Sequence, residues 1–205
     1  MEKIYESKAL NILKQNTVIL GATIDLKKTI KDSLYKKCAV IDDSFSYSTK
    51  TVGETITNYN FTISNLSGIE KKEISELTFD EYYYLAILIK ISLKPDVLII
   101  DNLFGFLNNA QKNNIINIAK KAKIELIIFD NELYYSYEGF DVIVIHENKT
   151  AIQGDFKDVV LQEKILKRLG YELPFYVDLS TQLKLFKLVN KVCYSREELE
   201  GLLWK

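Results

Sequence analysis

Residues 94–101 constrain this chain most, because a proline there precedes four apolar residues and a carboxylate. Pro95 cannot continue a helix, so it separates the segment before it from the apolar run after it. The run at 97–100 consists of β-branched residues and leucine, which is typical of a strand buried on both faces of a parallel sheet. Asp101 ends the run, and open α/β sheets bind ligands at the carboxyl ends of such strands. The sequence therefore predicts an α/β fold with Asp101 at the ligand-binding edge.

Length and composition exclude several classes of protein. The 205 residues suffice for one α/β domain with a core, and the net charge of −1 gives no electrostatic case for nucleic acid or an anionic membrane. Cys38 and Cys193 lie far apart without metal-like spacing, as expected for thiols in a reducing compartment. No apolar run reaches the roughly 20 residues of a membrane helix, and no signal-peptide pattern opens the chain. We therefore expect a cytoplasmic protein.

Local patterns predict the order of the other elements. Residues 78–81, Thr-Phe-Asp-Glu, form a capping box that opens an almost wholly apolar helix to about residue 93. The further predictions are a helix or an extended segment at 1–15, strands at 17–20, 39–41 and 126–129, helices at 27–36 and 109–123, an irregular region at 42–70, and a hairpin joining 142–145 to 151–152. From residue 155 the pattern is helical, broken at Gly170 and Pro174. We expect two parts, an α/β domain at 1–154 and a helical appendage at 155–205.

Taken together, these segments resemble an ABC-type ATPase, most closely the ATPase subunits of energy-coupling-factor (ECF) uptake transporters. Residues 94–101 look like the Walker B strand, 103–112 like the D-loop and its helix, and 141–154 like the family's hairpin. The stretch 169–175, Leu-Gly-Tyr-Glu-Leu-Pro-Phe, with the helical segments after it, looks like the ECF C-terminal appendage. The resemblance implies a P-loop NTPase-like, mostly parallel sheet flanked by helices, with a truncated β-subdomain before residue 17.

The phosphate loop of that family, Gly-x-x-Gly-x-Gly-Lys-Ser-Thr, corresponds to residues 21–29 of this chain. Gly21, Lys27 and Thr29 match it, whereas Ile24 and Leu26 stand where glycines let the backbone approach the phosphates. Solvated lysines at a helix start are the simpler interpretation of this stretch. We expect Gly21, Lys27 and Thr29 to be a vestigial nucleotide site.

The other catalytic motifs of the family are also altered. The resemblance implies a metal-binding role for Asp101, although a carboxylate that caps a neighbouring loop is the simpler alternative. Asn102 replaces the Glu that activates water, and the switch His is absent from residues 129–132, the only histidine being His146 on the later hairpin. Residues 42–43 are Asp-Asp where the family has Gln, the dimer-completing Leu-Ser-Gly-Gly-Gln reads Leu-Thr-Phe-Asp-Glu at 77–81, and Asn108 replaces the D-loop Asp. We therefore predict no catalytic residue.

Three functions remain open at this stage. The first is a catalytically degenerate ATPase-like subunit that needs no cofactor and acts through contacts with another ABC-type ATPase, a second copy or a membrane transporter subunit, at the inner face of the membrane. Its expected contact residues are Tyr171, Leu173, Pro174 and Phe175. The second is a functional ATP-binding subunit that uses ATP and Mg²⁺. The third is a stand-alone scaffold with the same fold. The tyrosines at 82–84 and at 134, 135 and 137 lack interleaved basic residues and give no case for nucleic acid.

Overall fold

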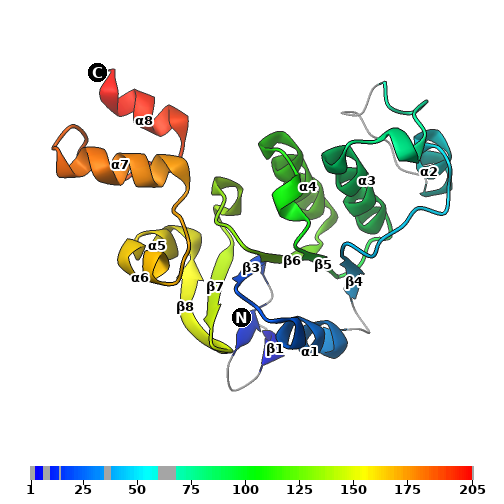
Figure 1. Ribbon diagram of the computed structural model, residues 1–205, viewed down its shortest axis with the longest axis horizontal. Helices are drawn as coiled ribbons and strands as arrows, with labels where there is room; N and C mark the ends of the chain where they lie inside the picture. The colour runs from blue at the N-terminus through cyan, green and yellow to red at the C-terminus, as the bar shows by residue number, and fades with distance from the viewer. Residues whose placement is uncertain (1–2, 7–9, 14, 35–37, 60–67, 205) are drawn as a thin grey trace.

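The computed structural model describes residues 3–6, 10–13, 15–34, 38–59 and 68–204. Its centre is a six-stranded sheet in the order β4-β5-β6-β3-β7-β8 (Figure 1). The strands are β3 (Thr17–Leu20), β4 (Cys38–Ile41), β5 (Val97–Asp101), β6 (Glu125–Asp130), β7 (Asp141–His146) and β8 (Lys149–Asp155). All neighbours pair in parallel except β7 and β8. The predicted mostly parallel α/β sheet is confirmed.

Helices cover both faces of the sheet (Figure 1). On one face lie α3 (Phe79–Ser92) and α4 (Asn109–Ala122), and on the other lies α1 (Ile24–Leu34). Consecutive strand residues alternate between the two layers, as the pleat requires. Leu98 and Ile100 belong to the core cluster on the α3 and α4 side, whereas Ile99 belongs to the cluster that contains Ile30 of α1. This two-sided burial explains why β5 is an unbroken apolar run.

The capping box before α3 is present as predicted. The Thr78 hydroxyl accepts a hydrogen bond from the Glu81 N–H at 3.4 Å, and the Glu81 carboxylate accepts one from the Thr78 N–H at 3.1 Å. The middle of α3 is buried without interruption from Tyr84 to Ile89, as its apolar composition predicts. The helix ends at Ser92, three residues before Pro95.

The amino-terminal segment forms an antiparallel pair, β1 (Lys3–Glu6) and β2 (Asn11–Leu13), which agrees with the extended alternative and with a short β-subdomain before residue 17. Two other local predictions were incomplete. The region expected to be irregular contains α2 (Val52–Tyr59), while residues 60–67 lie outside the described part. Helix α1 begins at Ile24, three residues before the predicted start, because Ile and Leu stabilise helix where glycines would not. Short 3₁₀ turns span Ile74–Glu76, Phe104–Phe106 and Tyr135–Tyr137.

The hairpin and the helical carboxyl-terminal part agree with the prediction. Glu147 and Asn148 connect β7 to β8 with φ of 49° and 60°, as in a two-residue type I′ turn. Four helices come after β8: α5 (Phe156–Val160), α6 (Glu163–Arg168), α7 (Phe175–Leu185) and α8 (Arg196–Leu203). The last two share a small hydrophobic cluster separate from the main core, built on Val189, Cys193 and Leu199. The division of the chain at residue 154 stays a prediction.

Candidate functional site

The carboxyl edge of the parallel strands holds the site. Asp101 ends β5, and α1 starts just after β3 at the same edge. An open cleft of about 680 Å³ lies there. Its lining combines cations, carboxylates and apolar side chains: Ile24, Lys27, Lys28, Lys31, Asp32, Asp42, Asp43, Tyr83, Asp101, Asn102, Leu103 and Phe106. The lining therefore combines charged side chains with the aromatic rings of Tyr83 and Phe106.

Two lysines of α1 bind the two oxygens of Asp101. Lys27 Nζ lies 2.7 Å from Oδ1, and Lys31 Nζ lies 2.7 Å from Oδ2. Residues four apart share a helix face, so α1 presents both ammonium groups to the same carboxylate. The side chains of Lys27 and Asp101 are each 13% exposed, so water screens this contact little. A metal ion at Asp101 would have to displace an ammonium group, and the residues as they stand do not fit Mg²⁺.

Asp42 extends the ion cluster to β4. Its Oδ2 lies 3.2 Å from Lys31 Nζ, and its Oδ1 accepts the Ser44 hydroxyl at 2.5 Å. The Ser44 hydrogen bond, opposed by burial and aided by Lys31, lowers the pKa of Asp42. Burial lowers the pKa of Lys31, but the hydrogen bonds and charges of Asp101 and Asp42 outweigh it and the net pKa is raised. Lys31 and Asp42 are therefore both ionised at neutral pH.

The stretch that corresponds to a phosphate loop is helical from Ile24 onward. The Lys27 N–H donates to the Thr23 carbonyl at 2.9 Å, so it is engaged in the helix rather than free for a phosphate. Asp25 in the first turn complements the positive end of the helix dipole. Its carboxylate would repel a polyphosphate at the same place. Only residues 21–23 remain as a loop between β3 and α1.

Gly21 lies under the carboxyl-terminal part of the chain. Its φ is +72°, and a Cβ there would lie 2.5 Å from the Ile145 carbonyl oxygen and 2.6 Å from the Tyr171 hydroxyl. Thr29 donates its hydroxyl to the Asp25 carbonyl at 2.8 Å on the exposed side of α1. Of the predicted nucleotide and metal residues, the structure thus brings only Lys27 and Asp101 together.

The four residues expected to contact a partner are mostly covered by this chain itself. Leu173 and Pro174 are buried, and Tyr171 is half-buried against the loop at Gly21. Phe175 is 70% exposed. Leu173 and Pro174 are buried within this chain, so they are not available on the surface as the sequence analysis expected. A partner contact at Phe175 stays a prediction.

Asn102 occupies the position of the family's water-activating Glu, and its backbone lies in the left-handed region with φ of 56°. Its backbone N–H donates to the Phe129 carbonyl at 2.9 Å, and its side-chain amide cannot act as a general base. At the end of β6, after which the family has its switch His, Asp130 is buried and accepts the Tyr137 hydroxyl. Burial raises the pKa of Asp130. His146 is exposed at the end of β7.

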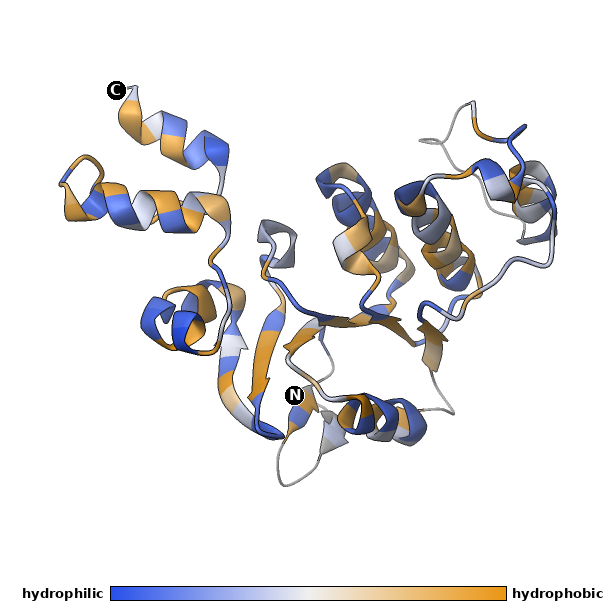
Figure 2. Cartoon of the chain, viewed as in Figure 1, coloured by the Kyte–Doolittle hydropathy of each residue, from blue (hydrophilic) through white to orange (hydrophobic). Residues whose placement is uncertain are grey.

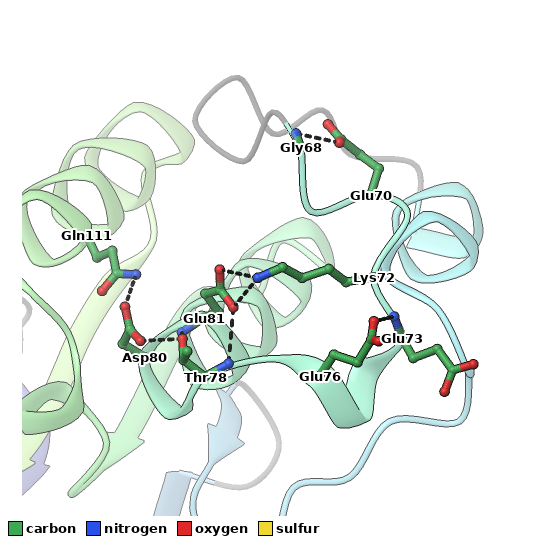
Figure 3. A network of polar contacts seen from close by, with 9 residues as sticks. All are labelled: Gly68, Glu70, Lys72, Glu73, Glu76, Thr78, Asp80, Glu81 and Gln111. Carbon is green, nitrogen blue, oxygen red and sulfur yellow. Dashed lines mark hydrogen bonds and ion pairs between the residues drawn. The ribbon is translucent and has the colours of Figure 1, made fainter.

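Carboxylates of this chain lie at the amino terminus of α3, as Figure 3 shows for Asp80 and Glu81. Glu81, whose carboxylate caps the helix, also binds Lys72 Nζ at 2.9 and 3.0 Å. Asp80 accepts the Thr78 hydroxyl at 2.6 Å and the Gln111 amide at 3.1 Å. In a dimer-completing motif this helix end would receive a phosphate. Here two carboxylates of the chain occupy that end.

Two site residues escaped the sequence analysis. Lys31 was not recognised, although its spacing of four from Lys27 places both lysines on one face of the helix predicted at 27–36. Tyr171 was assigned to a partner contact, and no local signal links it to Gly21. Among the residues that the structure describes, no group of three or more His, Cys, Asp or Glu side chains gathers as a metal site.

Solved structures place this architecture among known folds. A bacterial Atm1-family ABC exporter with ATP bound matches with a TM-score of 0.61 and 14% identity, covering 82% of this chain and 39% of that one. CbiO1 from Clostridium perfringens, part of the ABC transporter complex cbiONQ, matches with a TM-score of 0.56 and 16% identity, covering 78% and 86%. The fold is that of ABC ATPase domains. The resemblance inferred from the sequence is confirmed at this level.

The sequence relatives of this chain agree with the fold. A protein of Clostridium acetobutylicum assigned as an ABC transporter ATP-binding protein is 22% identical over 189 residues, covering 86% of this chain and 64% of that protein. The ECF transporter ATP-binding protein EcfA2 of Methanospirillum hungatei is 22% identical over 184 residues, covering 88% and 46%. EcfA1 of Lactobacillus delbrueckii is 26% identical over 125 residues, covering 59% and 40%. Homologues of this chain are thus ABC transporter ATP-binding proteins, including ECF subunits.

The chain spans less than two thirds of the length of these relatives, between 40% and 64%. No protein-family model matches it. Within the described residues, no helix combines the length and the apolar character that crossing a bilayer demands.

Proposed function

We propose that this chain is a catalytically degenerate ATPase-like subunit of an ABC-type uptake transporter of the ECF class, acting through protein contacts. One observation carries the proposal: both oxygens of Asp101 are held at 2.7 Å by ammonium groups of the same chain. Mg²⁺ is bound through oxygen ligands and keeps several waters, so it competes poorly where two cations are already fixed. Lys27, which would otherwise reach a phosphate, is the partner of the carboxylate that would otherwise hold the metal.

The remaining motif positions support the same conclusion. Asn102 supplies no base, and the exposed His146 lies on another strand. The carboxylates of Asp80 and Glu81 cap α3 at the end that would face a phosphate. Loss of a single positioned group typically costs about 10² to 10³ in rate. Loss of the base, the switch His and the phosphate-binding helix end together supports a role without hydrolysis.

A contact surface adjoins this altered site. Ile24, Phe79 and Phe106 are 84%, 75% and 51% exposed. The rings of Phe79 and Phe106 stack at 6.3 Å between centroids, and Tyr83 stacks on Phe106 at 5.2 Å. Exposed apolar side chains gathered beside a cleft are typical of interaction sites. We call Ile24, Phe79, Tyr83 and Phe106 the hydrophobic rim. We expect the hydrophobic rim to contact another ABC-type ATPase subunit or a second copy at the inner face of the membrane.

Calorimetric titration with ATP, with and without Mg²⁺, tests the catalytic half of the proposal. We expect no saturable heat in either condition. Lys27→Ala is the diagnostic variant, and Lys28→Ala is its matched control because Lys28 is exposed one position along α1. Micromolar binding by the unaltered chain that Lys27→Ala abolishes and Lys28→Ala preserves would overturn the proposal.

Light scattering after size exclusion, with and without a co-expressed ECF-type ATPase, tests the contact half. We expect a complex that Phe79→Ser with Phe106→Ser weakens. The matched control is Leu93→Ser, since Leu93 is 58% exposed at the opposite end of α3. A chain that stays monomeric and captures neither an ATPase nor a transporter subunit would instead support the stand-alone scaffold.

A second candidate is a functional ATP-binding subunit that uses ATP and Mg²⁺. One specific observation favours it: Lys27 and Asp101 lie together on an open cleft of about 680 Å³, the arrangement from which a phosphate and a metal site could form once the ion pairs separate. The calorimetric titration decides between the two candidates.

A further inference from the structure

The end of α7 and the end of α8 expose apolar side chains far from the altered site. Leu185, Phe186 and Leu188 are 80%, 76% and 62% exposed, and Trp204 is 83% exposed. We call these four residues the apolar tip. Figure 2 shows the turn after α7 in the hydrophobic colour at the far end of that helix. The ends of both helices point to the same side in Figure 1.

The apolar tip is not needed by the small core beneath it. Val189, Cys193 and Leu199 are buried there, and Leu183 and Leu202 pack against them. The residues of the apolar tip lie outside this cluster. Their exposure is therefore not the by-product of a core that requires apolar residues at those positions.

Lysines, and no carboxylates, occupy the segment that carries Leu185, Phe186 and Leu188. Residues 179–194 include Lys184, Lys187 and Lys191 but no Asp or Glu. A shallow cleft of about 520 Å³ beside the apolar tip is lined by Lys184, Lys187, Leu188, Val189, Asn190 and Leu202. Glu197 and Glu198 occupy the first turn of α8 and interact with Tyr135 at the end of the helix away from Trp204, and Glu200 is paired with Arg196 at 2.7 Å. This end of the molecule is thus locally cationic, although the whole chain carries −1.

We propose that the apolar tip docks on the surface of an anionic lipid bilayer. Exposed Leu, Phe and Trp beside lysines form the combination that inserts shallowly at the headgroup level, with the cations attracted to anionic lipids. The lysines and the absence of Asp and Glu from residues 179–194 favour an anionic surface over a neutral protein groove. This inference does not depend on the proposed function, because a stand-alone protein with this surface would bind lipid equally.

Sedimentation with vesicles of phosphatidylglycerol and phosphatidylcholine, compared with phosphatidylcholine alone, tests the proposal. We expect binding to the anionic vesicles only, weakened by added salt because screening reduces the lysine contribution. Trp204 is the only tryptophan of the chain, so its fluorescence should shift to the blue on binding and be quenched by brominated lipid.

Variants locate the contact. Phe186→Ser with Leu188→Ser should lower the partition coefficient at least about tenfold, since each side chain loses an apolar burial. Lys184→Gln with Lys187→Gln should lower it about 25-fold on anionic vesicles, about fivefold for each lysine. The matched controls are Leu93→Ser, at a residue 58% exposed at the end of α3, and Lys120→Gln with Lys121→Gln, on the exposed side of α4.

The proposal is overturned by absence of vesicle binding, by equal binding to both lipid compositions, or by equal loss in the control variants. If Phe186→Ser instead converts a dimer into a monomer and vesicles do not bind, the apolar tip is a protein interface and the membrane proposal fails. Pure lipid vesicles contain no ATPase or transporter partner, so neither outcome bears on the proposed function.

Discussion

Replacing Asp101 by Asn should destabilise the protein. The Asn side chain keeps the shape of the carboxylate and one acceptor, but it removes the negative charge that holds two ammonium groups at 2.7 Å. In a site that awaits a metal, a carboxylate without its cation raises the energy of the folded protein, and neutralising it stabilises that protein. In this chain the opposite sign is expected, because the lysines already neutralise Asp101.

The size of the effect depends on the exposure of the groups. Removing one partner of a fully buried pair costs about 3–5 kcal/mol, and an exposed pair contributes about 0–1 kcal/mol. Asp101 and Lys27 are each 13% exposed and Lys31 is 21% exposed, near the buried end of that range. Because Asn can still accept one hydrogen bond, we expect a loss of about 2–4 kcal/mol in the free energy of unfolding.

Urea denaturation followed by far-ultraviolet circular dichroism measures this loss. With a slope of about 2 kcal/mol/M, the midpoint should fall by roughly 1–2 M. Glu200→Gln is the control, since Glu200 contacts Arg196 at the same distance of 2.7 Å with both side chains largely exposed, and its midpoint should not change measurably. An unchanged or higher midpoint for Asp101→Asn would refute the assignment of Asp101 to a structural ion cluster.

Three further outcomes are expected. Gly21→Ala should lower the free energy of unfolding by about 1–2 kcal/mol for its φ of +72° and by about 1–3 kcal/mol more because the new Cβ would lie 2.5 Å from a carbonyl oxygen. Gly139→Ala, with φ of +80° and no atom near the new Cβ, should lose only the roughly 1–2 kcal/mol that the backbone conformation costs, as urea titrations will measure. Thr78→Ala should lower the free energy of unfolding by about 1 kcal/mol by removing the cap of α3, as thermal and urea unfolding will measure. Because the pKa of Lys31 is raised in the folded protein, Lys31 contributes its full stabilisation below its unfolded pKa of about 10.4, and this contribution is lost as the pH rises through the folded pKa. Because the pKa of Asp42 is lowered, Asp42 contributes its full stabilisation above its unfolded pKa of about 3.9, and this contribution is lost as the pH falls through the folded pKa. Urea midpoints against pH should therefore decline at both ends, and Asp42→Asn should reduce the acid decline and, because Asp42 helps to raise the pKa of Lys31, part of the alkaline decline.

The sheet and most helices were predictable because their signals are local. The apolar run of β5 and the capping box of α3 each contain their own explanation within a few residues. The turn at Glu147 and Asn148 was predicted for the same reason. The start of α1 was missed because the family pattern assigns a loop to residues 21–26, whereas the propensities of Ile24 and Leu26 favour helix.

The candidate site was predictable only in part. The family pattern indicated Lys27 and Asp101, but their mutual ion pair depends on how α1 lies against β5, which no local pattern encodes. The second cation, Lys31, and the position of Tyr171 over Gly21 are likewise products of tertiary packing. The expected exposure of Leu173 and Pro174 was wrong for the same reason, because the sequence of an apolar segment does not distinguish residues that face solvent from residues that pack on the core.

The place of β3 in the sheet has a consequence for how the protein is made. This strand is synthesised first among the six, yet both of its neighbours, β6 and β7, come from the second half of the chain. Until β6 and β7 have been synthesised, β3 therefore has unpaired backbone groups along both edges and no native strand to pair with. The nascent chain must be kept from aggregating until the two late strands emerge and enclose the early one.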